Sequence, residues 1–216
     1  MHREKYLIKN TGIIFIGRFC TRLITFLLLP LYTSLLTTDE YGTYDLVISY
    51  MNLLVPVITL QIGGALFRYL IDVRDDKEGI KQIISNGICI LGLGSLVTMV
   101  IMVVLQVWCK DFDTILIPMF LFYAVSDVIL QIARGLGNNI DYSLASIVVG
   151  VSNVLLDVIF LVLLRLQLQG LLISVVIANA MGILFLWYRL KLSRYVSFSA
   201  FQTTIDDSCL FGTSIL

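Results

Sequence analysis

Two arginines stand four residues apart in an otherwise apolar stretch near the N-terminus. Arg18 and Arg22 lie in the run from Gly12 to Leu36, and this spacing puts both side chains on one face of a helix. Charged groups within a bilayer are costly, and the forked guanidinium suits phosphate. We expect the pair to line a hydrated cavity and bind a negatively charged substrate. A second interpretation stays open, in which Arg18 reaches the inner interface and Arg22 pairs with a carboxylate.

Two carboxylates lie within other apolar runs, each with an amide at helical spacing. Gln131 follows Asp127 by four residues, and Asn153 precedes Asp157 by four. Each pair therefore forms a polar patch on one helix face. Three roles are open for Asp127 and Asp157: binding a proton or cation from an ion gradient, pairing with the arginines, or hydrogen bonding between helices.

The elements that carry these residues are long apolar segments. The 216 residues are 58% hydrophobic and only 14% charged, well outside the usual balance of a soluble domain. A helix needs about 20 apolar residues to cross a bilayer. The sequence therefore predicts an all-α membrane protein with six transmembrane helices, at about 12–36, 46–66, 83–107, 115–133, 144–164 and 170–188.

Lysine and arginine are distributed unequally between the predicted connectors. With the N-terminus inside, eleven basic residues fall in inner segments and two in outer connectors, while Arg18 and Arg22 lie in the first helix. This bias indicates a cytoplasmic N-terminus. The inner residues are Arg3, Lys5, Lys9, Arg68, Arg74, Lys77, Lys81, Arg134, Arg189, Lys191 and Arg194.

Other sequence features bear on dynamics and chemistry. Pro30 and Pro56 lie inside the first two predicted helices and favour kinks, and Gly170 and Gly182 could allow close helix approach. Walker A, HExxH and CxxC motifs are missing from the sequence, and its one histidine is His2. We therefore expect no enzymatic activity, no cofactor and no metal site.

Several short segments carry a family resemblance. The segments are Lys9-Asn10-Thr11-Gly12, Leu29-Pro30-Leu31-Tyr32-Thr33, Asp39-Glu40-Tyr41-Gly42-Thr43-Tyr44-Asp45-Leu46, Ala65-Leu66-Phe67-Arg68-Tyr69, Ala133-Arg134-Gly135-Leu136 and Asn138-Asn139. They resemble the opening of bacterial Wzx-type polysaccharide flippases, which belong to the multidrug/oligosaccharidyl-lipid/polysaccharide exporter superfamily. The Pro-Leu-Tyr-Thr and Glu-Tyr-Gly segments are the more specific ones, and the likeness covers nearly the whole chain.

The resemblance implies a function and a set of partners. Such a protein moves an undecaprenyl-diphosphate-linked oligosaccharide to the outer face of the bacterial inner membrane for surface polysaccharides such as O-antigen or capsule. Family members enclose a cationic cavity between two six-helix lobes, and Arg22 matches the basic position in the family's first helix. The implied partners are the lipid-linked oligosaccharide, membrane lipids, a second lobe or second copy, and polysaccharide polymerase machinery; nucleic acid is not among them.

Length is the departure from that family, whose members have twelve or more helices. We expect residues 1–190 to form one six-helix lobe and 191–216 a cytoplasmic segment that leads towards a missing second lobe. A truncated product is favoured over a half-transporter that pairs with another polypeptide. The alternatives are a multidrug and toxin extrusion antiporter, a peptidoglycan lipid-precursor flippase, and a non-transport membrane subunit of an envelope assembly complex.

Overall fold

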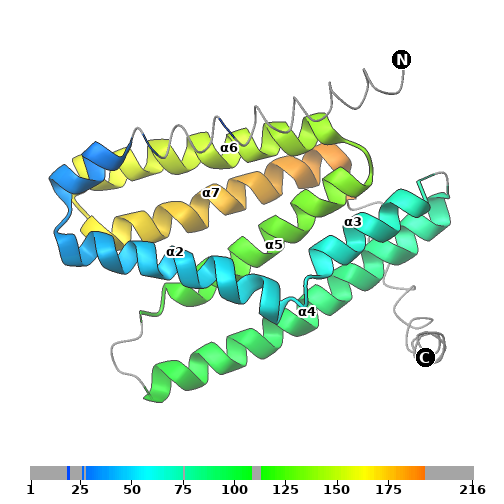
Figure 1. Cartoon of the computed structure of the whole chain (residues 1–216), viewed down its shortest axis with the longest axis horizontal. Coiled ribbons are helices and arrows are strands. Elements are labelled where there is room, and N and C mark those ends of the chain that lie inside the picture. Colours follow the sequence, from blue (N-terminus) through cyan, green and yellow to red (C-terminus); the bar gives the residue numbers. More distant parts are fainter. Residues whose placement is uncertain (1–18, 20–25, 27, 75, 109–112, 193–216) are drawn as a thin grey trace.

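The described part of the chain consists of helices that run side by side (Figure 1). The computed structural model describes residues 19, 26, 28–74, 76–108 and 113–192, and no strand occurs among them. Residues 28–35 are helical. They are followed by α2 (Thr38–Ile58), α3 (Ile62–Asp72), α4 (Lys77–Trp108), α5 (Leu116–Gly135), α6 (Asn139–Val158), the π-helix η1 (Ile159–Leu163) and α7 (Gln167–Leu190).

The second predicted helix is broken. One span was expected over 46–66, but the structure has α2 and α3, which are bent by 55° relative to each other. Leu60 and Gln61 lie at the break with φ of 49° and 55°, a left-handed conformation that cannot continue a helix. Pro56, which was expected to favour a kink, lies in α2 shortly before this break. The bend therefore follows the proline by one helical turn.

Four helices are long and apolar enough to cross a membrane, or five spans if the bent pair α2–α3 counts as one. The four are α4, α5, α6 continued by η1, and α7, and they correspond to the ranges 83–107, 115–133, 144–164 and 170–188. Most of the range 12–36 lies outside the described residues. The count of six spans therefore stays a prediction.

Glycines allow close packing around α7. A Cβ added to Gly182 of α7 would lie 2.3 Å from Cγ2 of Val149 in α6, and one added to Gly170 would lie 2.9 Å from Cβ of Phe160. Both positions are buried, so any side chain there would separate the helices. Close helix approach, which the sequence allowed at these two glycines, is what the structure shows.

Helix α4 lies at the edge of the bundle and exposes a broad apolar face. Leu93, Leu96, Val97, Val100 and Val104 each expose about half of their surface or more. An exposed apolar surface of this extent marks contact with lipid or a partner. This face agrees with a multi-pass membrane protein.

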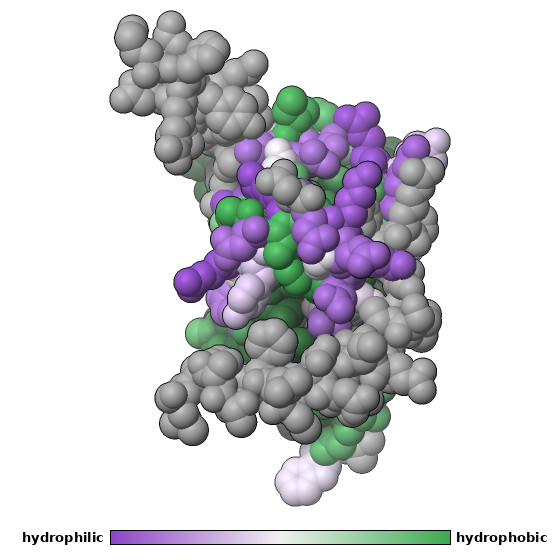
Figure 2. Space-filling view, turned by 90° about the vertical axis from the view of Figure 1, so that its right-hand side faces the viewer, coloured by the Kyte–Doolittle hydropathy of each residue, from purple (hydrophilic) through white to green (hydrophobic). Residues whose placement is uncertain are grey.

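Polar side chains gather at one end of the bundle. This end carries the α3–α4 and α5–α6 connections and the C-terminus of α7 (Figure 1), and Figure 2 shows hydrophilic residues concentrated on it. Seven of the eleven basic residues predicted to be inside are described, and all belong to these segments: Arg68, Arg74, Lys77, Lys81, Arg134, Arg189 and Lys191. We call it the basic end.

Candidate functional site

A buried carboxyl group lies in the membrane-spanning part of α6. The side chain of Asp157 is fully buried. It lies six residues before the end of η1 and eighteen after the start of α6, which puts it about 27 Å from the basic end and about 9 Å from the other end. Asp157 is therefore far from the connectors that carry most of the basic residues.

Three neutral side chains surround this carboxyl group. The Tyr32 hydroxyl donates to Oδ2 of Asp157 at 2.5 Å, and Nδ2 of Asn153 donates to the same oxygen at 3.0 Å. The Ser174 hydroxyl contacts Oδ1. No lysine or arginine of the described residues forms an ion pair with Asp157. The site is thus a carboxyl group held by hydrogen bonds from the first helix, α6 and α7.

Ser174 has two acceptors within reach of one hydroxyl proton. Its Oγ contacts Asp157, and it also lies 2.7 Å from the main-chain oxygen of Leu171. A hydroxyl donates one hydrogen bond and accepts others. When Asp157 is ionised, the Ser174 hydroxyl donates its proton to the carboxylate and no longer donates to the Leu171 oxygen. When Asp157 carries a proton on Oδ1, that proton is donated to the Ser174 oxygen, and the Ser174 hydroxyl donates to the Leu171 oxygen. The arrangement therefore accommodates both protonation states of Asp157.

The wall of the site includes aromatic rings and an irregular helix. The ring centroid of Tyr32 lies 6.2 Å from that of Tyr41 and 6.4 Å from that of Tyr44. Two residues after Asp157, α6 changes into the π-helix η1. Single turns of π-helix are frequent at functional sites. The backbone is thus irregular at the point where the buried carboxyl group lies.

Asp127 lies elsewhere in the bundle. Its Oδ2 would be 3.5 Å from a Cβ added to Gly63 of α3, and Gln131 lies beside the same glycine. Asp127 is eight residues from the end of α5, about 12 Å from the basic end. Its side chain is exposed. The structure therefore does not bring Asp127 and Asp157 together.

The remaining predicted site residues, Arg18 and Arg22, lie outside the described residues. Their orientation, and any pairing with a carboxylate, stay predictions. Within the described part of the chain, histidine, cysteine, aspartate and glutamate form no group of three that could hold a metal ion.

Two arginines at the basic end have structural partners. The Arg134 guanidinium lies 4.6 Å from the ring centroid of Phe67 and 5.4 Å from that of Tyr142. Arg74 donates from Nε to the main-chain oxygen of Gly135 at 2.9 Å, at the C-terminus of α5. Arg74 and Arg134 thus hold α3, α5 and α6 together here.

Comparison with known proteins gives the family. Residues 7–216 match the family model described as polysaccharide biosynthesis protein. The chain belongs to this family. Curated proteins gave no significant match.

This chain has the fold of solved transporters of the MOP superfamily. It matches a multidrug resistance MATE family transporter in an outward-facing conformation, with a TM-score of 0.68, 20% identity, and coverage of 88% of this chain and 46% of that one. It also matches a MATE transporter in complex with Br-NRF, with a TM-score of 0.66, 21% identity, and coverage of 89% and 49%.

A third match is a solved transporter whose binding pocket has reverse polarity, which suggests a different function for that protein. It is a MOP superfamily transporter from Pyrococcus furiosus, with a TM-score of 0.66, 16% identity, and coverage of 87% of this chain and 44% of that one. At these identities the likeness shows the fold. The chain spans about half the length of the solved structures it matches, as expected for one lobe of a two-lobed protein.

Sequence reasoning found part of the site. It singled out Asp157 and Asn153, and the structure joins them by a hydrogen bond. It missed Ser174 and the contact of Tyr32 with Asp157, which comes from 125 residues away in the sequence. The available signals were a tyrosine two residues after Pro30 and a lone serine in an apolar run of α7.

Proposed function

We propose that this chain is one lobe of a transporter that moves undecaprenyl-diphosphate-linked oligosaccharide across the bacterial inner membrane for surface polysaccharide synthesis. The family match over residues 7–216 is the observation that carries the proposal. The fold of MOP superfamily transporters supports it. The second lobe is supplied by the rest of a longer polypeptide, by another chain or by a second copy.

In this proposal the N-terminus and the basic end face the cytoplasm. Short connectors rich in lysine and arginine stay on the cytoplasmic side of a membrane, and the α3–α4 connector and the C-terminus of α7 are such segments. Arg18 and Arg22 face the cavity between the lobes and bind the diphosphate, because the guanidinium group makes paired hydrogen bonds to phosphate oxygens. No covalent bond is made or broken.

Asp157 is the proposed ion-coupling site. A buried carboxyl group with only neutral neighbours among the described residues is costly to ionise in a membrane, and here two hydrogen-bond arrangements suit its two protonation states. Uptake of a proton would turn the Ser174 hydroxyl from Asp157 towards Leu171 in α7. A change of charge at Asp157 thereby alters the contact between α6 and α7. Asp127 is the weaker candidate for this role because its side chain is exposed.

A complementation experiment tests the substrate. The chain is produced in a bacterium that lacks its own polysaccharide flippase, together with the C-terminal lobe of that flippase, and co-purification establishes that the two halves assemble. We expect surface polysaccharide to return and the lipid-linked intermediate to fall. An assembled complex that leaves surface polysaccharide missing would contradict the proposal.

The same strain separates the closest alternative functions. Resistance to cationic drugs without surface polysaccharide would indicate an extrusion antiporter, which the fold permits. Rescue of cells depleted of their peptidoglycan precursor flippase would indicate that other lipid-diphosphate substrate. Neither result is expected here, because the family match is to polysaccharide biosynthesis proteins.

A further inference from the structure

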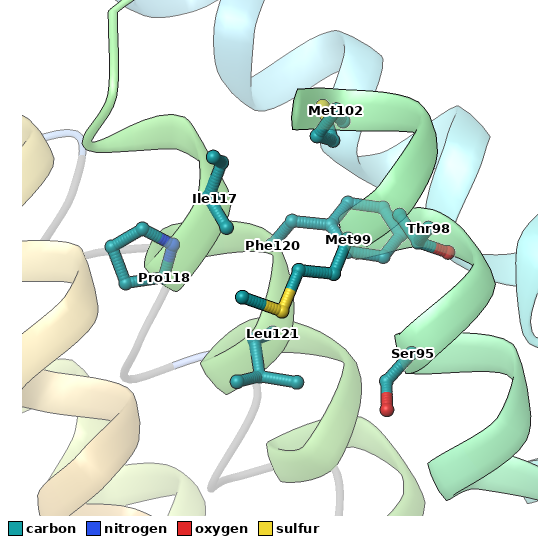
Figure 3. A pocket seen from close by; sticks show the side chains of 8 residues that line it. All are labelled: Ser95, Thr98, Met99, Met102, Ile117, Pro118, Phe120 and Leu121. Carbon is teal, nitrogen blue, oxygen red and sulfur yellow. The ribbon is translucent and has the colours of Figure 1, made fainter. Parts of the chain in front are cut away.

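Helices α4 and α5 leave an apolar crevice between them on the side of the bundle away from Asp157. A cavity of about 280 Å³ is lined by residues that include Thr98, Met99 and Phe120, and Figure 3 shows their side chains lying between the two helices. A second cavity of about 190 Å³ lies next to it, and Ser95 lines both. We call the two together the α4–α5 crevice.

The crevice offers an apolar guest almost no competing polar group. Its lining is aliphatic and aromatic except for the hydroxyls of Ser95 and Thr98 and the indole of Trp187. Both hydroxyls donate within α4, Ser95 to the Gly92 oxygen at 2.8 Å and Thr98 to the Gly94 oxygen at 2.7 Å. A void of this kind inside a bilayer is filled by hydrocarbon, because close packing is favoured and water would find no partners.

Two tryptophans indicate how deep the crevice reaches. Trp187 lines the smaller cavity together with Ile88, and Trp108 ends α4 with 86% of its surface exposed. Twenty residues separate Ile88 from Trp108, a rise of about 30 Å, which equals the hydrocarbon thickness of a bilayer and suits tryptophans at both interfaces. On this scale the crevice continues from Ile88 to Met102, about 21 Å. It therefore passes the mid-plane, where the chain of a lipid in one leaflet ends.

The entrance of the crevice carries positive charge. Leu192 closes the smaller cavity at the basic end, and Lys191 directly precedes it. Lys81 lies seven residues before Ile88, two turns towards the basic end on the same face of α4. With Lys77 they make three cations, while the carboxylates of Asp76, which accepts a hydrogen bond at the start of α4, and of Glu78 lie farther from the crevice along the chain than Lys81 does. An anionic headgroup fits at this level.

We propose that the α4–α5 crevice holds the isoprenoid chain of a polyprenyl phosphate, with the phosphate at Lys81 and Lys191. This inference rests on the proposed function and assigns the lipid part of its substrate to the outer face of the lobe. A long isoprenoid chain can fill both cavities, whereas one acyl chain of a phospholipid fills the half nearest its headgroup. The oligosaccharide would then travel through the cavity between the lobes while its lipid stays in contact with the membrane.

Gly92 provides a variant that blocks the crevice without a clash. It lines the smaller cavity, and a Cβ added there meets no atom within 4 Å. Gly42 in α2 is equally open and does not line the crevice. Gly92→Leu therefore fills part of the smaller cavity, in the half of the crevice nearest the basic end, and Gly42→Leu is its matched control.

Native mass spectrometry of the purified chain measures binding of undecaprenyl phosphate and of phosphatidylglycerol. We expect Gly92→Leu to weaken the binding of undecaprenyl phosphate about tenfold. This loss corresponds to fewer than two buried methylene groups. Gly42→Leu should leave this binding unchanged. Equal binding of undecaprenyl phosphate to both variants would overturn the proposal.

A second pair of variants guards against misfolding. Met99→Trp narrows the larger cavity, and Leu96→Trp, at an exposed position of α4 that does not line the crevice, is its control. The same loss of undecaprenyl phosphate binding is expected for Met99→Trp alone. Phosphatidylglycerol should bind this variant as it binds the native protein, because one acyl chain fills only the half of the crevice nearest its headgroup. An equal loss of phosphatidylglycerol binding in Met99→Trp would overturn the proposal, because the crevice would then be a phospholipid site. The outcomes for binding and for transport distinguish the two proposals. An assembled complex that binds undecaprenyl phosphate in the crevice but exports no polysaccharide would refute the proposed function. A complex that exports polysaccharide but binds no undecaprenyl phosphate in the crevice would refute this inference.

Discussion

Replacement of Asp157 by leucine should destabilise the bundle much more than replacement by asparagine. Leucine removes both acceptors and leaves the Tyr32 hydroxyl and the Asn153 amide without the partner that each has in the structure. An unsatisfied buried donor costs about 1 to 3 kcal/mol, so two cost about 2 to 6 kcal/mol. Asparagine keeps one oxygen to accept from Tyr32 and Asn153 and an amide to donate to Ser174. It therefore imitates protonated Asp157 and should cost about 1 kcal/mol or less.

Thermal unfolding in detergent, followed by tryptophan fluorescence, measures this difference. For a chain of this size about 1 kcal/mol corresponds to roughly 2 to 4 °C. Asp157→Leu should therefore lower the midpoint at least about twice as far as Asp157→Asn, by at least about 4 °C against at most about 2 °C at the smaller conversion factor. Equal midpoints for the two variants would refute the hydrogen-bond network around Asp157.

Three further predictions concern packing, the basic end and the substrate. Gly182→Ala should destabilise the protein by about 1 to 3 kcal/mol, because the added methyl group meets α6. The control Gly42→Ala, in open space, should be at least as stable as the native protein. Thermal unfolding midpoints measure both, and equal losses of stability would contradict the close spacing of α6 and α7. Arg74→Ala should lower stability by about 1 kcal/mol because the C-terminus of α5 loses its cationic cap, and an unchanged midpoint would show that water replaces the cap. Arg22→Ala in the assembled transporter should abolish surface polysaccharide at a normal membrane level, with Arg22→Lys partly active; full activity of the alanine variant would exclude a diphosphate contact.

Much of the helix content could be predicted because lipid requires it. Backbone groups in a bilayer must be satisfied within the helix, so long apolar runs such as that of α4 leave one regular solution. The prediction failed at 46–66, where an apolar run is divided by residues with positive φ. Leu60 is not a residue type that signals such a conformation, and Pro56 indicates a bend without fixing its position.

The site was only partly predictable because its partners come from different helices. The spacing of Asn153 and Asp157 is local, so helical periodicity alone places them together. The contacts of Asp157 with Tyr32 and Ser174 depend on how the first helix and α7 pack against α6. That packing is set in part by glycines such as Gly182, and a single sequence does not say which helix each glycine faces.

The coupling role proposed for Asp157 is tested most directly in the flippase-deficient strain that carries the assembled transporter. Surface polysaccharide is compared between native protein and Asp157→Asn at equal membrane levels, since this variant is expected to fold. We predict that the native protein exports polysaccharide and that Asp157→Asn, which cannot release a proton from this position, does not. Equal export by the two proteins would contradict the assignment of Asp157 as the coupling site.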